Sequence, residues 1–183
     1  MPSKSLHASK PVIVGIKHDY ENERGLEDAV NLVRVQLNGL PKGSRVAIPH
    51  GDVFYGQYQN EALARGLTLV EIGGAKNVNS HSRKQPIIDL DLRTRNESTN
   101  EDEIARHSIN VNDCLETLRR ESPTVTIVPL RHAIEMTRVL GDKYHVILQA
   151  EAKDEEIETN ERNRHKYADM YELIDRARSR RFK

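Results

Sequence analysis

The sequence predicts a three-layer α/β fold, in which a mainly parallel five- or six-stranded sheet lies between two layers of helices. Short segments of strand length alternate along the chain with longer segments that have helical periodicity. Most of the short segments are apolar and rich in β-branched residues, which is typical of strands covered on both faces. Because a strand, a helix and the next parallel strand close in right-handed units, this alternation predicts helices on both faces of one sheet.

The first half of the chain contains three predicted strands with helices between them. Residues 11–16, PVIVGI, form a continuous apolar run. A helix over 24–38 is indicated by apolar residues three, four and seven positions apart, and Gly39 with Pro41 ends it. A second helix over 53–65 ends at Gly66. The other two strands are 45–49 and 67–72, and the residues of the second helix expected to face inward are Tyr55, Tyr58, Ala62 and Leu63.

The second half continues the alternation after a polar loop over 73–86. Residues 87–92, IIDLDL, alternate apolar and acidic residues, which predicts a strand with one wet face. A helix begins at Asn100, where Glu103 completes a capping-box pattern, and it buries Ile104, Ser108, Val111, Leu115 and Leu118. The remaining predicted elements are a strand over 124–129, a helix over 132–140, a strand over 144–149, and one long helix over 153–180 that buries Tyr167, Met170, Tyr171, Ile174 and Ala177.

Composition narrows the classes of protein that the chain can be. Its 183 residues carry 28 basic and 28 acidic side chains, so no global charge favours nucleic acid or an anionic membrane. The single cysteine, Cys114, excludes an intramolecular disulfide framework and is expected to be a small core residue. No apolar run is long enough to span a membrane. We expect a cytoplasmic protein with a flexible tail over 1–10 and a single α/β domain over 11–183.

Polar residues follow several of the predicted strands, where open α/β sheets bind their ligands. The first strand is followed by Lys17, His18 and Asp19, and the second by His50, Gly51 and Asp52. Histidine titrates near neutral pH and binds metals, and a neighbouring carboxylate fixes its tautomer. The third strand is followed by a loop with Gly73, Gly74 and Lys76, and the strand over 124–129 by Arg131 and His132.

These residues predict one catalytic site formed by His18, His50, Asp52 and His132. If a divalent metal such as Zn, Mn or Mg binds, then His18, His50 and Asp52 are its expected ligands, with His132 as a fourth ligand or an acid. Without a metal, a histidine serves as general base, and Arg131 or Lys76 stabilises developing negative charge. The competing interpretation is that the histidines are ordinary loop residues. His145 is expected in the core, and His7, His81, His107 and His165 are expected to face solvent.

The segment VIVGIKHD resembles the opening G-x-x-H of the erythromycin esterase-like and TraB/TIKI-like superfamily, with Gly15 and His18 at the matching positions. The later segment NERNRHKYADM is similar to that superfamily's E-R-(D/N) helix at Glu161, Arg162 and Asn163. The resemblance implies hydrolysis of ester or peptide bonds, often with a metal, and adds Arg162 to the substrate-binding residues. The acidic residue that ends the second strand of that superfamily, and a second G-x-x-H, are missing here.

Two further functions compete with the hydrolase. The missing family residues favour a non-catalytic module that binds a small anionic ligand over Gly73, Gly74 and Lys76, or a protein partner. A nucleic-acid contact would use the basic C-terminal segment, although cations there also complement a helix dipole. Its cations are Arg176, Arg178, Arg180, Arg181 and Lys183.

The strand order distinguishes these alternatives. If the first two strands are neighbours, His18, His50 and Asp52 should share one cleft. His132 should join them if the strand over 124–129 pairs beside the first strand.

Overall fold

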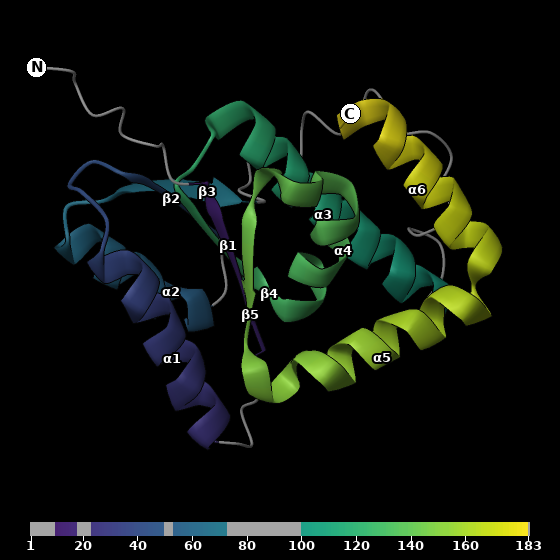
Figure 1. Ribbon diagram of the computed structural model, residues 1–183, viewed down its shortest axis with the longest axis horizontal. Helices are drawn as coiled ribbons and strands as arrows, with labels where there is room; N and C mark the ends of the chain where they lie inside the picture. Colours follow the sequence, from purple (N-terminus) through teal and green to yellow (C-terminus); the bar gives the residue numbers. More distant parts are fainter. Residues whose placement is uncertain (1–9, 18–22, 50–52, 73–99, 183) are drawn as a thin grey trace, which may run out of the picture.

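The computed structural model describes residues 10–17, 23–49, 53–72 and 100–182 (Figure 1). The strands are β1 (Val12–Ile16), β2 (Arg45–Pro49), β3 (Thr68–Ile72), β4 (Val125–Pro129) and β5 (His145–Leu148). The helices are α1 (Glu23–Asn38), α2 (Val53–Ala64), α3 (Asn100–Glu121), α4 (Leu130–Leu140), the short 3-10 helix Gly141–Lys143, α5 (Ala150–Lys166) and α6 (Ala168–Phe182). The predicted strand over 87–92 and the predicted N-terminal tail fall almost entirely outside the described residues.

The strands form one sheet in the order β3-β2-β4-β1-β5, and every described pair is parallel. Helices α1 and α2 cover one face and helices α3 and α4 the other, so the three-layer α/β prediction is confirmed (Figure 1). No helix in the described part of the chain has the length and apolar character needed to cross a membrane.

Each face of the sheet has its own core. On the first face, Val14, Ile16, Val46 and Ile48 pack against α1 and α2. On the second face, Ile13, Ala47 and Val70 pack against α3 and α4. Successive residues of a strand point to opposite faces, which is why strands in this sheet must be apolar at consecutive positions. Cys114 belongs to the second core, where burial raises the pKa of its thiol to about 12.

Three details of the predicted helices are corrected. The predicted helix over 153–180 is two helices, because Tyr167 leaves the helical conformation with φ −119° and ψ 44°. The α5–α6 hairpin thus formed packs beside α4 and α3, on the right of Figure 1. Leu63, which was expected to face inward, is 57% exposed. Ala177 is exposed as well, and its neighbour Arg178 is buried instead.

Gly15 in β1 lies where α4 packs tightly against the sheet. A Cβ atom at this position would lie 2.6 Å from the Cβ of Ala133 and 3.0 Å from Cδ2 of Leu148. The first of these contacts is with a rigid methyl group held by the helix backbone, so the neighbour cannot rotate away. The glycine of the VIVGIKHD segment is therefore explained by packing alone.

We expect Gly15→Ala to lower the free energy of unfolding by about 1–3 kcal/mol, because it overpacks the contact between β1 and α4. Urea unfolding of both proteins measures the difference. Gly56→Ala is the matched control. Apart from the neighbouring backbone of its own helix, no atom of the described residues lies within 4 Å of the position of its Cβ, and alanine is favoured over glycine inside a helix such as α2. A Gly15→Ala protein as stable as the wild type would contradict the packing explanation.

Candidate functional site

The strand order places the carboxyl end of β4 between those of β1 and β2. The chain leaves β1 and β2 toward the face covered by α1 and α2, and it leaves β4 toward the opposite face. Such a reversal opens a crevice between neighbouring strand ends, where ligands of open α/β sheets bind. The predicted cleft shared by His18, His50 and Asp52 required β1 and β2 to be neighbours, and this condition is not met. Strand β4 separates them, so their ends lie about 10 Å apart. The condition for His132 is met, because β4 pairs directly with β1.

Most of the predicted site residues lie outside the described residues. They are His18, His50, Asp52, Gly73, Gly74 and Lys76. The structure does establish where the chain leaves the sheet before them. Ile16 of β1 is in register with Pro129 of β4, and Pro49 of β2 is in register with Ile72 of β3. The strands that precede these residues therefore end at one edge of the sheet.

The described part of this edge contains a hydrogen-bonded glutamine that the sequence analysis missed. The backbone N–H of Lys17, just after β1, donates to Oε1 of Gln149 at 2.8 Å. Nε2 of Gln149 donates to the backbone oxygen of Gly25 in α1 at 3.0 Å. Gln149 is only 4% exposed and directly follows β5. It ties the ends of β1 and β5 to the start of α1, but nothing distinguishes it in the sequence from any other loop glutamine.

Lys17 forms the outer part of the same connection. Its ammonium group lies 3.0 Å from Glu155 and 3.5 Å from Glu156, both in the first half of α5. The hydrogen bond to Glu155 raises the pKa of Lys17, against the opposing effect of burial. Lys17 is therefore held by α5, and its charge is already compensated by carboxylates.

His132 lies in the first turn of α4 and faces α3 rather than β1. Its ring centroid is 4.7 Å from that of His107, with the ring planes tilted by 33°. His107 was expected to face solvent but is only 8% exposed, and its Nε2 atom has no hydrogen-bond partner among the described residues. In contrast, His145 was expected in the core and is exposed on the edge strand β5. The prediction that His145 lies in a strand is correct. Its exposure could not be predicted, because only the strand order shows that β5 is an edge strand.

Both histidines of this pair are neutral at physiological pH. Burial lowers the pKa of His132 to about 4, assisted by the positive charges of Arg131 and Arg178. Burial likewise lowers the pKa of His107 to about 2, and the charges of His132 and Arg131 act in the same direction. The pair can therefore offer hydrogen-bond donors and lone pairs, whereas a proton donor at neutral pH would need a much higher pKa.

One turn further along α4, Glu135 is fully buried at 0% exposure. It accepts hydrogen bonds from Arg164 at 2.8 and 3.0 Å, from Arg178 at 2.9 Å and from Asn160 at 2.7 Å. Asp175 in α6 receives the remaining donors of Arg164, at 2.8 and 3.1 Å. These five residues, which we call the Glu135 cluster, join α4 to the α5–α6 hairpin.

The charges within the Glu135 cluster compensate one another. Burial by itself would raise the pKa of Glu135, but hydrogen bonds from Arg164 and Asn160 and the charges of both arginines lower it to about 2. Arg178 is only 2% exposed and also donates to Asn112 at 2.9 Å and to Ser108 in α3. The sequence analysis interpreted Arg178 as a cation of the C-terminal segment. Arg178 follows Tyr171 and Ile174 at helical spacing, on the same buried face of α6. This spacing could have predicted from the sequence that Arg178 is buried.

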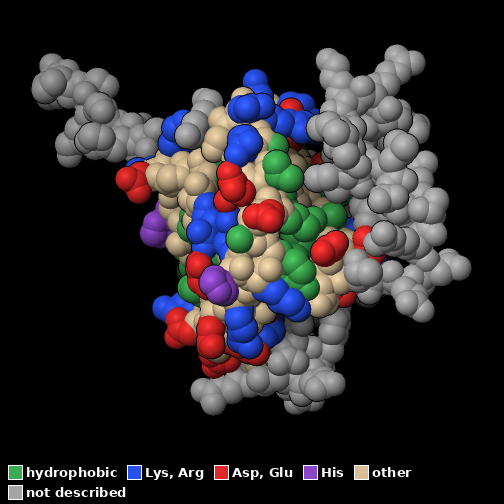
Figure 2. Space-filling view, turned by 90° about the vertical axis from the view of Figure 1, so that its right-hand side faces the viewer, with side chains coloured by type: hydrophobic (Ala, Val, Ile, Leu, Met, Phe, Trp, Pro, Cys, Tyr) green, Lys and Arg blue, Asp and Glu red, His purple; other side chains and the backbone are tan. Residues whose placement is uncertain are grey.

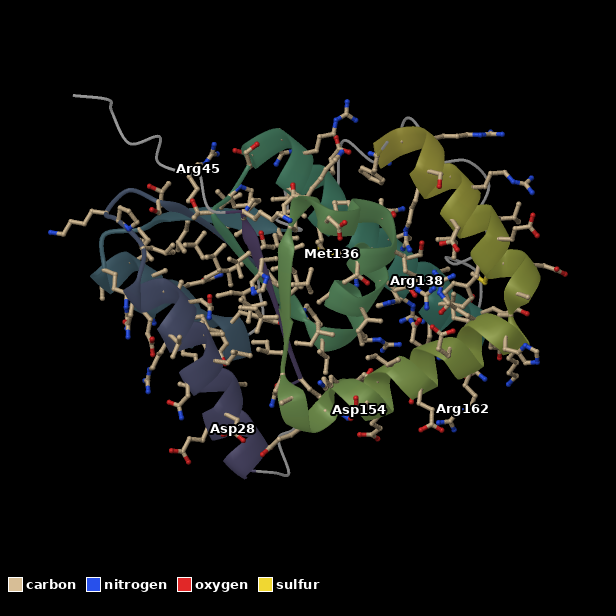
Figure 3. All side chains as sticks on the ribbon, viewed as in Figure 1. Asp28, Arg45, Met136, Arg138, Asp154 and Arg162 are labelled. Carbon is tan, nitrogen blue, oxygen red and sulfur yellow. The ribbon has the colours of Figure 1, made fainter. Side chains whose placement is uncertain are left out.

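Two predicted substrate-binding residues, Arg131 and Arg162, are described and lie in different settings. Arg131 is exposed beside His132 in the first turn of α4, and no salt bridge joins it to another described residue. Arg162 is 72% exposed and pairs with Glu158, four residues earlier in α5. Figure 3 shows Arg162 on the outer side of that helix, whereas Met136 points from α4 toward the sheet. The structure therefore keeps Arg131 beside His132 and leaves Arg162 facing solvent.

No protein-family model matches the chain, and no curated protein or solved structure is significantly similar to it.

Proposed function

We propose that the chain is a hydrolase whose reaction takes place at the carboxyl ends of β1, β4 and β2. The observation that carries this proposal is the strand order β2-β4-β1, in which β4 is flanked by the two strands that precede the histidines. His18 follows β1 by two residues, and His50 and Asp52 follow β2. Strand ends about 10 Å apart leave room for an ion or a scissile bond between side chains that reach from both sides.

Two imidazoles and one carboxylate form a ligand set that suits a catalytic divalent metal, because three protein ligands leave one coordination position open for water. Among the described residues, no group of three or more histidine, cysteine or acidic side chains could hold a metal. His18, His50 and Asp52, which follow β1 and β2, are the residues that we propose would hold it. A bound Zn²⁺, Mn²⁺ or Mg²⁺ would supply a water of lowered pKa.

Arg131 and His132 have distinct roles in this proposal. The exposed guanidinium of Arg131, which forms no salt bridge with another described residue, would stabilise negative charge that develops on the substrate. His132 has a pKa of about 4 and so does not serve as a general acid at neutral pH. It orients substrate or water through its ring nitrogens instead. His107, whose ring lies against it, restricts the orientations that the His132 ring can adopt.

The test combines metal content with hydrolysis of chromogenic carboxylic and phosphate esters. We expect the purified protein to bind about one divalent ion. His18→Ala and His50→Ala should each lower the metal affinity at least tenfold, because replacing even a group that only hydrogen-bonds to a metal ligand lowers the affinity ~10–100-fold. His165→Ala, which changes an exposed histidine of α5, is the matched control. Unchanged metal binding and hydrolysis in both variants, with unchanged melting temperatures, would contradict the proposal.

A second candidate function is supported by the exposed cation at the start of α4. With Arg131 engaged in no salt bridge among the described residues, a non-catalytic protein could bind a small anion here. Phosphate at 100 times its dissociation constant would then stabilise the fold by about 2.7 kcal/mol. Arg131→Met should abolish that stabilisation, with Arg162→Met as control. Stabilisation by phosphate without hydrolysis of any ester would favour this candidate over the hydrolase.

Three of the C-terminal arginines do not favour the nucleic-acid alternative. Arg178 is buried, Arg176 pairs with Glu172, and Arg181 pairs with Glu116. Figure 2 shows acidic and basic side chains interspersed on the face that includes the hairpin. A phosphate backbone needs a cationic track, and intermixed carboxylates weaken it.

A further inference from the structure

Strands β1 and β2, which precede His18 and His50, each lose regular backbone pairing at the carboxyl end. Strand β1 pairs with β4 as far as Ile16, whereas β2 pairs with β4 only at Val46 and Ala47. The last two residues of β2 therefore depart from β4, although they still pair with β3. Because buried backbone groups need hydrogen-bond partners, other groups are expected to bind the ends of both strands.

At the end of β2, the pairing is interrupted by Pro49. The carbonyl of Arg45 accepts a hydrogen bond from the N–H of Thr124, just before β4, at 2.8 Å. Odd-numbered residues of β2 therefore direct their backbone groups toward β4. Pro49 is one of them, but it has no N–H to donate. Its carbonyl oxygen accepts a hydrogen bond from Nε2 of Gln59 in α2, at 3.1 Å, so a side-chain amide holds the end of this strand.

At the end of β1, the pairing is interrupted by the start of α5. The N–H of Gln149 donates to the carbonyl of Gly15 at 2.9 Å, so the next acceptor of a parallel ladder would be the carbonyl of Gln149 itself. Gln149 is the N-cap of α5, however, and the carbonyl of an N-cap residue accepts the first hydrogen bond of its helix. Its side-chain Oε1 takes the place of that carbonyl and accepts from the N–H of Lys17 at 2.8 Å.

The Gln149 side chain is fixed at both ends of its amide. Besides the bond to β1, its Nε2 donates to the carbonyl of Gly25 in α1 at 3.0 Å, and the residue is only 4% exposed. Figure 1 shows the starts of α1 and α5 close together, where β5 leads into α5. Gln59 is partly buried and lies in the helix that follows β2. Each glutamine therefore connects the end of one strand to a helix that packs beside it.

We propose that Gln149 and Gln59 are positioning residues, which hold the backbone before His18 and His50 at a fixed separation on the two sides of β4. This inference rests on the proposed function, because it concerns residues assigned to that reaction. Each amide is hydrogen-bonded to the residue immediately before one of the two histidines. Metal sites tolerate deviations of only ~0.2 Å in their ligand distances. A displacement of about 1 Å at a reacting group can lower a rate about 100-fold.

Replacement by methionine distinguishes positioning from a contribution to stability alone. Gln149→Met and Gln59→Met retain an unbranched side chain of similar length and remove its hydrogen bonds. Proton–carbon correlation spectra of the histidine rings, recorded on the metal-free full chain, are the first measurement. We expect Gln149→Met to shift the ring signals of His18 and Gln59→Met to shift those of His50. The signals of His165, which is exposed on α5, should stay unchanged in both variants.

Binding of Zn²⁺ is the second measurement. Each methionine variant should bind Zn²⁺ about tenfold more weakly or worse, because groups that orient metal ligands contribute ~10–100-fold to metal affinity. Asn60→Ala, which changes an exposed amide of α2, is the matched control and should leave both the ring signals and the affinity unchanged. If Gln149→Met does not fold, Gln59→Met tests the same proposal at a less buried position.

Ring signals and Zn²⁺ affinity equal to those of the wild type in the folded variants would overturn the proposal, even if their melting temperatures fall. The two amides would then contribute to stability alone. Failure of the proposed function gives a different result, in which the wild type neither binds Zn²⁺ nor hydrolyses an ester. In that case the ring signals of the metal-free proteins still decide whether the amides position His18 and His50.

Discussion

Glu135→Ala should lower the free energy of unfolding by about 3–5 kcal/mol, the cost of breaking a buried ion pair from one side. Arg178, at 2% exposure, would then be buried in α6 with no carboxylate to receive its Nη1 donor. Arg164 would keep Asp175 but lose both of its bonds to α4. Because Glu135 joins α4 to the hairpin, we expect the loss to appear as loosened packing of α5 and α6 rather than of the sheet.

Urea unfolding measures the difference, and Glu161→Ala is the matched control. Glu161 also connects the hairpin to α4, through Arg138, but its side chain is 59% exposed. Surface pairs of this kind contribute about 1 kcal/mol or less. Glu135→Gln should fall between the two, because the amide still accepts a hydrogen bond while carrying no charge. A loss below about 1 kcal/mol for Glu135→Ala would mean that the two arginines find water or other partners when the carboxylate is gone.

The fold could be predicted from the sequence because burial on both faces leaves a direct pattern in the residues. The segments PVIVGI and TVTIVP consist almost entirely of apolar or β-branched residues, which is typical of a strand covered by helices on both faces. The order of the strands could not be predicted, since no local pattern records which strand pairs with which. That order is what separates β1 from β2 and places β5 at an edge.

The Glu135 cluster was missed for a related reason. From the sequence, Glu135 in α4 and Arg178 in the basic C-terminal segment would each be placed on the surface. Only the structure shows that the two side chains are buried and hydrogen-bonded to each other. The break at Tyr167 was missed because the residues around it are compatible with a helix. The hairpin is instead selected by tertiary contacts, among them the Arg164 guanidinium 4.5 Å from the ring centroid of Tyr171.

The folded protein should lose stability on mild acidification, well above the pH at which its carboxylates titrate. In the folded chain the pKa of His132 is about 4 and that of His107 about 2, against 6.5 for an ordinary histidine. Between pH 6.5 and 4 the unfolded chain therefore binds between one and two more protons than the folded chain at these positions. Stability then falls with falling pH, by on the order of 4 kcal/mol between pH 7 and pH 5. Glu135, whose pKa is about 2, stays ionised over this range.

Replacing the pair separates this effect from the other titrating groups. The double variant His107→Phe, His132→Phe preserves two packed rings and removes both protons, so its stability should change much less between pH 7 and pH 5. His165→Ala, at an exposed position, should retain the full dependence. Glu135 affects stability over a lower pH range. Its pKa in the folded chain, about 2, lies below its ordinary value of 4.5, so its contribution to the free energy of unfolding is complete above pH 4.5 and is lost as the pH falls toward 2. Urea unfolding at pH 7, 6 and 5 is the measurement. Equal slopes for the wild type and the double variant would show that the rings become solvated before they titrate, and that the contact between α3 and α4 opens first.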